Sequence, residues 1–126
     1  MRVRTIFLLC LAPFVIGSLQ GCGGDDPDPK GEEGPLGACP PDSAAEQAAG
    51  LDALMGNCSI CHSTTKVGAA ARANAPEGAN VDDPTYVSEH AEKIYEEIDE
   101  GAMPPTGRLQ DATVESIRIY LACETQ

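Results

Sequence analysis

The sequence is poor in large aromatic residues. Tryptophan is absent, and both phenylalanines, Phe7 and Phe14, lie near the start of the 126-residue chain. Aromatic side chains contribute the largest apolar areas to protein cores, so their scarcity excludes a large core in the remainder. A small domain with so thin a core usually depends on a covalent link or a bound group for stability.

Basic residues are scarce as well. The chain has 8 lysines and arginines against 20 aspartates and glutamates, which gives a net charge of −12. Such an acidic surface excludes electrostatic binding of nucleic acid or of anionic lipid. It can select a basic face on a partner protein, and it equally serves solubility alone.

Only one long apolar run is present, and it lies at the N-terminus. Arg2 and Arg4 precede a mostly apolar run over residues 5–19, which is too short to span a bilayer comfortably. This order is typical of a secretory signal peptide, and we assign residues 1–21 to it. Because that segment holds two arginines and no acidic residue, the net charge of the remainder is −14.

A cysteine follows this segment directly. Leu19-Gln20-Gly21-Cys22 resembles the lipobox of bacterial lipoproteins, where the chain is cut before the cysteine and its thiol is acylated. The resemblance implies a lipid anchor on Cys22; the alternative is an ordinary signal peptide and a soluble exported protein. In some bacteria an aspartate directly after the acylated cysteine retains a lipoprotein at the inner membrane. This chain has Gly23 at that position, which favours the periplasmic face of the outer membrane.

Residues 23–41 are rich in glycine, proline and acidic residues and offer almost nothing to bury. Together with Cys22 they predict a disordered tether over residues 22–41. The remaining residues, 42–126, are enough for one small domain. The chain thus divides into a lipoprotein signal peptide, an anchored tether and a single domain.

The stretch Cys58-Ser59-Ile60-Cys61-His62 has the pattern Cys-x-x-Cys-His, the attachment site of a c-type haem. Two cysteines at this spacing lie on nearly the same side of a helical turn, which suits two thioether bonds to one porphyrin. His62 then lies under the iron as its proximal ligand. The alternatives are a redox pair of cysteines, or half of a zinc site with an incidental histidine.

Two further cysteines remain: Cys39 lies before the predicted helical region and Cys123 at its end. Cys10 belongs to the predicted signal peptide and is removed with it. An exported protein can keep a disulfide. A bond between these two would close a long loop and stabilise the fold by about 4–5 kcal/mol. The alternative is a pair of free buried thiols.

The first predicted helix begins with Asp42 or Ser43 as its cap and continues to Cys58. Its apolar positions at helical spacing are Ala44, Ala48, Leu51 and Met55. Gly50 interrupts an otherwise strong helix former, which suggests that another backbone approaches closely there.

Two more helices are predicted after a long irregular loop over residues 63–82, a length that usually indicates a function. The second has Asp83 as its cap and Pro84 at its first position, and it ends at Gly101. The third covers residues 111–123. Their apolar faces are Val87, Ala91, Ile94 and Ile98 in the second helix and Val114, Ile117 and Leu121 in the third.

A haem iron held by His62 has a second axial position. Met103 lies in a proline-stiffened loop far enough along the chain to pass round the porphyrin edge, whereas Met55 is one turn before Cys58 and cannot readily reach the opposite side. Ligation by a thioether favours reduced iron and raises the potential. The alternative ligand is His90, the only other histidine.

Several patterns, taken in order, resemble class I cytochrome c in its small monohaem bacterial form. They are the Cys-x-x-Cys-His stretch at 58–62, the Gly-Ala-Met-Pro-Pro-x-Gly loop at 101–107, and Ile117 with Tyr120 and Leu121. Gly50 and Leu54 stand where that family has the glycine and the bulky residue of its N-terminal helix. The resemblance spans residues 42–123.

The resemblance implies an all-α cytochrome c fold, with three main helices around one covalently attached haem and the first and last helices crossing at Gly50. It implies haem thioethers on Cys58 and Cys61. A carbonyl near Ala75 and Pro76 would hold the imidazole N–H of the proximal histidine. Candidate partners of the haem propionates are Arg72, Arg108, Tyr86 and Tyr95.

The resemblance further implies a membrane-tethered one-electron carrier with His62 and Met103 on the iron, rather than an enzyme. We expect a monomer that exchanges electrons with redox donor and acceptor proteins. Three alternatives remain open at this point: a haem-containing electron-entry subunit of a larger redox enzyme, a gas-binding haem sensor, or a lipoprotein module without haem.

Overall fold

The computed structural model describes residues 34–126. The predicted signal peptide, Cys22 and the first part of the predicted tether lie outside these residues. Within them the chain forms three helices and no strand: α1 (Ala44–Cys58), α2 (Pro84–Asp99) and α3 (Asp111–Glu124). The prediction of an all-α fold is confirmed for this part of the chain. None of the three helices is long and apolar enough to cross a bilayer.

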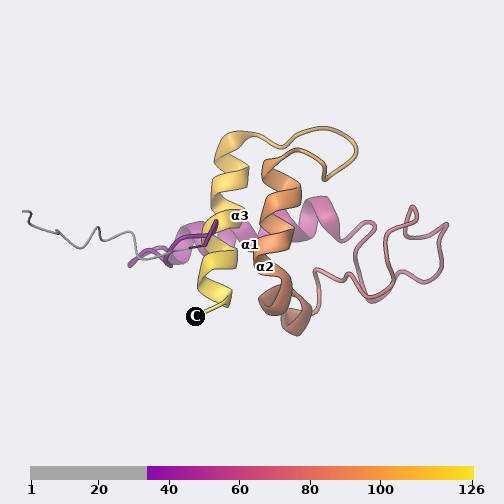
Figure 1. The fold of residues 1–126 in the computed structure, drawn as a ribbon, viewed down its shortest axis with the longest axis horizontal. Helices are drawn as coiled ribbons and strands as arrows, with labels where there is room; N and C mark the ends of the chain where they lie inside the picture. Colours follow the sequence, from indigo (N-terminus) through magenta and orange to yellow (C-terminus); the bar gives the residue numbers. More distant parts are fainter. Residues whose placement is uncertain (1–33) are drawn as a thin grey trace, which may run out of the picture.

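Helix α3 contacts both other helices. Figure 1 shows α2 and α3 side by side, with α1 running across them. The core between them is small, as the scarcity of aromatic residues predicts. Its largest fully buried apolar side chains are Leu54, Val87, Ile98, Ile117 and Leu121.

The crossing of α1 and α3 depends on a missing side chain. A Cβ atom on Gly50 would lie 2.1 Å from the carbonyl oxygen of Ser116 and 2.7 Å from the Cβ atom of Tyr120. Both contacts are far shorter than van der Waals distance, so only glycine fits at this point of α1. The close approach of another backbone at Gly50 is therefore confirmed, and that backbone belongs to α3.

The predicted apolar face of α1 is confirmed only for Met55, which packs against the core, and is wrong for its other three residues. Ala44 and Ala48 are exposed, and Leu51 keeps 39% of its surface exposed. The buried face consists instead of Gly50 and Leu54. Alanines occur on several sides of α1, so the helical spacing of apolar residues does not indicate which side is buried. The family resemblance, in contrast, named Gly50 and Leu54, which are buried.

The helix ends follow the sequence signals in part. The Asp83 carboxylate accepts hydrogen bonds from the backbone N–H groups of Thr85 and Tyr86, as predicted for a cap. Ser43 precedes α1, but its hydroxyl donates to the Pro40 carbonyl and does not cap the helix. The predicted ends of α2 and α3 differ from the observed ones by one or two residues, which is the usual uncertainty.

The residues just before α1 pack onto the helices. Leu36 is only 4% exposed and belongs to the core, and the Arg118 side chain donates to its carbonyl oxygen. Cys39 and Cys123 form a disulfide, with Cα atoms 4.7 Å apart. The prediction of a disordered tether is therefore wrong for residues 34–41, because Leu36 supplies an apolar side chain to bury there.

Candidate haem site

The end of α1 delivers the two cysteines and the histidine to one turn. The backbone N–H groups of Cys61 and His62 both donate to the carbonyl oxygen of Cys58, over 3.1 and 2.8 Å. Helical geometry thus continues past the last residue of α1. This is the local conformation that the Cys-x-x-Cys-His spacing predicts.

This turn forms one wall of a cavity of about 450 Å³. Cys58, Cys61 and His62 line it together with Met103, which comes from the segment between α2 and α3. Other lining side chains are mostly apolar and include Ile94, Ile98, Pro104 and Pro105. The volume lies within the range of sites for small molecules and cofactors. The structure therefore brings all four predicted haem-binding residues to one place.

The ring of His62 is held by a single carbonyl group. Its Nδ1 atom lies 3.1 Å from the carbonyl oxygen of Ala79. Because a carbonyl oxygen only accepts hydrogen bonds, Nδ1 carries a proton, and in the neutral ring Nε2 keeps a lone pair. A histidine in this tautomer is ready to ligate a metal through Nε2. The backbone around it is fixed as well, since the Val81 N–H donates to the His62 carbonyl over 2.9 Å.

The acceptor of the His62 ring is not the one that the resemblance implies. The carbonyl oxygens of Ala75 and Pro76 accept from the guanidinium of Arg72 instead. That guanidinium shapes the loop so that the Ala79 carbonyl, a few residues later, meets the ring. The predicted position of the acceptor is therefore corrected to Ala79.

The thiol of Cys58 differs from that of a reactive redox pair. Cys58 and Cys61 are not joined to each other. Burial, together with the neighbouring Cys61, raises the pKa of the Cys58 thiol to about 11. Reactive redox cysteines have a lowered pKa, because the thiolate is the nucleophile. For the zinc alternative, residues 34–126 hold no group of three His, Cys, Asp or Glu side chains arranged to bind a metal ion.

Met103 lines the cavity from a loop anchored at both ends. Its backbone N–H donates to the Glu97 carbonyl oxygen of α2 over 2.8 Å. Beyond the two prolines, the Arg108 side chain donates to the Asp99 carbonyl and lies 3.6 Å from the Asp111 carboxylate. The Met103 side chain is 37% exposed, so it has freedom to adjust to a bound group.

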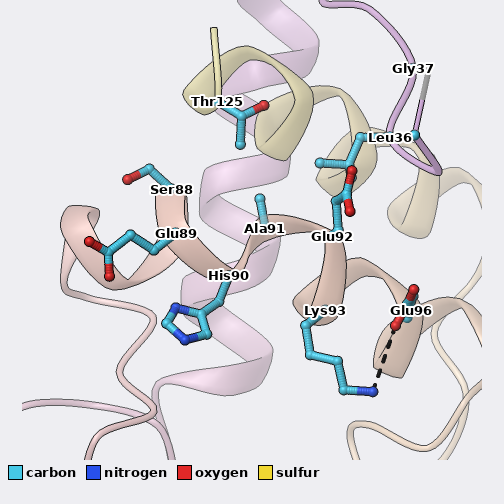
Figure 2. A pocket seen from close by; sticks show the side chains of 11 residues that line it. Leu36, Gly37, Ser88, Glu89, His90, Ala91, Glu92, Lys93, Glu96 and Thr125 are labelled. Carbon is cyan, nitrogen blue, oxygen red and sulfur yellow. Dashed lines mark ion pairs between the residues drawn. The ribbon is translucent and has the colours of Figure 1, made fainter. Parts of the chain in front are cut away.

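The alternative ligand His90 lies elsewhere. It lines a second pocket of about 480 Å³, shown in Figure 2, where it projects from α2 with Glu89 and Lys93. Its ring stacks on that of Tyr86, with ring centroids 4.2 Å apart, and its Nδ1 atom lies 3.0 Å from the Tyr86 carbonyl. His90 is not among the residues that line the first cavity, and Met103 is.

The four candidate propionate partners divide into two groups. Arg72 and Tyr86 line the cavity, whereas Arg108 and Tyr95 do not. Arg72 is nevertheless a poor hydrogen-bond partner for a carboxylate, because its N–H groups already contact six acceptors within the loop. The prediction that Arg72 donates directly to a propionate is therefore corrected. Of the four candidates, Tyr86 is the one that lines the cavity and whose side chain is not already engaged in this way.

A carboxylate ties the residues after His62 to the start of α2. Asp82 accepts hydrogen bonds from the Ser63 hydroxyl over 2.7 Å and from the Thr64 N–H over 2.8 Å. The bond from Ser63, and next the bond from Thr64, lower the pKa of Asp82. Both hydrogen bonds favour the charged form of Asp82, so the link from Asp82 to Ser63 and Thr64, called the Asp82 clamp below, requires a deprotonated carboxylate.

Protonation of Asp82 should weaken the fold in acid. Its pKa is lower in the folded than in the unfolded chain, so its contribution is complete above the ordinary aspartate value of about 3.9 and is lost as the pH falls through the folded value. We expect Asp82→Asn to lower the thermal midpoint at neutral pH and to flatten its decline in acid. The exposed Asp52→Asn on α1 is the control and should keep the wild-type profile. Parallel profiles for wild type and Asp82→Asn would contradict the clamp.

Sequence reasoning missed the parts of the site that lie in the irregular loop. Asp82 and its partners Ser63 and Thr64 are far apart in sequence and form no periodic pattern. One signal was available for Arg72, which is the only charged residue between positions 67 and 76. A lone charge in so apolar a segment indicates a buried, fully bonded group rather than a solvated one.

Comparison of the chain with models of protein families, with curated proteins and with solved structures gives no match. The resemblance to class I cytochrome c therefore stays a prediction that depends on the residues of this chain.

Proposed function

We propose that this chain is a one-electron carrier that binds a c-type haem through Cys58 and Cys61, with His62 and Met103 as the axial ligands of the iron. One observation carries the proposal: these four side chains, from two distant segments, line the same apolar cavity. The cavity also fits the group chemically, because it offers two thiols, one imidazole nitrogen and one thioether among mostly apolar side chains, with the charged Arg72, Lys93 and Glu97 also in its lining.

The haem supplies the reversible change between Fe(II) and Fe(III). The residues of the chain hold it and set how easily it is reduced. His62 is fixed in the ligating tautomer by Ala79. The thioether of Met103 is a soft ligand that favours reduced iron. Apolar walls such as Ile94 and Ile98 limit the access of water and so favour the less charged state of the iron.

The cellular setting belongs to the same proposal. Cys22 would carry the lipid anchor, and the following residues would let the domain turn toward its partners at the periplasmic face of the outer membrane. Residues 34–126 hold 15 acidic and 5 basic residues, so we expect donor and acceptor proteins that present basic faces. We propose a monomer that transforms no substrate of its own.

Covalent attachment is the most direct test. After expression with an intact export signal and a haem-attachment system, wild type should retain a haem stain on a denaturing gel, since only covalently bound haem survives denaturation. The double variant Cys58→Ala/Cys61→Ala should lose the stain completely. The control Cys39→Ala/Cys123→Ala also removes two cysteines but leaves both attachment positions, so it should keep a stain, at a lower yield because the disulfide that it removes stabilises the fold. Absence of the stain from wild type would overturn the proposed function.

A further inference from the structure

The loop between the haem-binding turn and α2 is built around a buried cation. Arg72 is only 1% exposed, and none of the ion pairs among residues 34–126 includes it. Its side chain contacts the carbonyl oxygens of Ser63, Lys66, Ala75, Pro76 and Ala79 and the amide oxygen of Asn80. Burying a charge that has only neutral partners costs free energy. If position 72 served packing alone, an apolar residue would fill it at a smaller cost in free energy.

One of these acceptors is the carbonyl that holds His62. The Ala79 oxygen receives an Nη2–H of Arg72 over 2.9 Å and the Nδ1–H of His62 over 3.1 Å. Two donors on one oxygen compete, because each polarises the same lone-pair density. The cationic donor is the stronger of the two. The bond that His62 donates is therefore weaker than it would be to a free carbonyl.

The strength of that bond matters for a metal ligand. A strong acceptor at Nδ1 pulls the proton away and makes the opposite nitrogen more basic, which stabilises the oxidised metal. Arg72 limits this effect, and its positive charge beside the cavity also disfavours the extra charge of Fe(III). Both effects act in the same direction, toward the reduced iron.

We propose that Arg72 is a positioning residue that raises the reduction potential by sharing the Ala79 carbonyl with His62. The proposal rests on the proposed function, since it requires that His62 ligates the iron. It assigns to Arg72 a task different from a direct hydrogen bond to a propionate, for which it has no free N–H group.

The test uses the haem-loaded protein and three variants. Arg72→Gln removes the charge and the forked donor. Arg72→Lys keeps the charge but cannot reach all of the carbonyl groups. Arg118→Gln is the matched control, because it removes the same charge from α3 at a residue that does not line the cavity. A haem stain, a redox titration and the NMR resonance of the His62 Nδ1–H in the reduced protein are recorded for each.

We expect Arg72→Gln to shift the equilibrium between Fe(II) and Fe(III) about tenfold toward Fe(III), which is ~59 mV for a one-electron couple. The His62 Nδ1–H resonance should move downfield as its bond to Ala79 strengthens. Arg72→Lys should show the same NMR shift with a smaller change in potential. Arg118→Gln should change neither quantity. A potential and a resonance in Arg72→Gln that match those of Arg118→Gln would overturn the proposal.

A measurement on wild type keeps the proposal testable if the Arg72 variants fail to fold. Couplings across hydrogen bonds should link the Ala79 carbonyl carbon to nitrogen atoms of both Arg72 and His62. If only one of the two nitrogens shows such a coupling, Ala79 is not shared and the inference is wrong. The proposed function fails in a different way, through a wild-type protein without covalent haem.

Discussion

Gly50→Ala should remove most of the stability of the domain, whereas Gly56→Ala in the same helix should slightly increase it. The two variants add the same methyl group to α1. We expect Gly50→Ala to lower the free energy of unfolding by about 3 kcal/mol or more, and Gly56→Ala to raise it by roughly 0.5–1 kcal/mol. Urea unfolding followed by far-ultraviolet circular dichroism measures both values.

The difference follows from what each new methyl group meets. At position 50 it would lie 2.1 Å from the Ser116 carbonyl oxygen and 2.7 Å from the Ser116 carbonyl carbon. Both are backbone atoms of α3, so no side-chain rotation can relieve the overlap. At position 56 no atom lies within 4 Å. The second methyl group therefore only restricts the unfolded chain and improves helix propensity.

The damage at Gly50 should extend to the cavity. Helix α1 carries Cys58 at its last residue, so a shift of α1 against α3 moves the wall that holds the thioether positions. We therefore expect less covalent haem in Gly50→Ala than in Gly56→Ala. Equal stability of the two variants would show that the helices do not cross as described.

Local signals in the sequence predicted more than long-range ones. Asp83 and Pro84 start α2 as predicted, because a cap and a proline at the first position act within one turn. The boundary of the tether was wrong, because Leu36 is buried in a core whose other residues come from helices farther along the chain. The acceptor for His62 was wrong for a different reason: the carbonyl groups of Ala75 and Pro76 are taken up by Arg72 of the same irregular loop, and no periodic pattern marks these bonds.

The candidate site could be named in advance because its residues are chemically rare in this chain. Only two histidines are present, and Met103 is the one methionine outside a helix among residues 34–126. The sequence left Met103 and His90 as alternatives, and it had no means of deciding which would reach the cavity. The packing of α2 favours Met103: Ile94, Ile98 and Met103 line the cavity, whereas His90, one turn before Ile94, does not.

Met103→Ala should abolish the weak far-red band of methionine-ligated oxidised haem and lower the reduction potential. The expected fall is on the order of 100 mV, within the ~0.8 V over which axial ligands set haem potentials. Its reason is that a thioether favours reduced iron, and alanine cannot replace it. The fold should persist, because the side chain is 37% exposed and contributes little to the core. An optical spectrum and a redox titration measure the two effects.

Two control variants separate ligation from packing. Met55→Leu changes the other methionine of the described chain, which packs against the core. Its volume is nearly conserved, so we expect less than about 1.5 kcal/mol of destabilisation and an unchanged band. His90→Ala removes a ring that stacks on Tyr86 but does not itself line the cavity. It should also leave the band intact. Absence of the band from wild type, with a reduction potential that changes in His90→Ala and not in Met103→Ala, would make His90 the ligand.

The same variant distinguishes an electron carrier from a gas sensor. If Met103 occupies the second axial position, reduced wild type should not bind carbon monoxide without denaturation, whereas reduced Met103→Ala should bind it readily. The backbone bond from Met103 to Glu97 favours this outcome, because it holds the start of the loop against α2. Binding of carbon monoxide to native wild type would show that Met103 yields its position easily. The cavity would then serve a ligand-binding function in place of electron transfer alone.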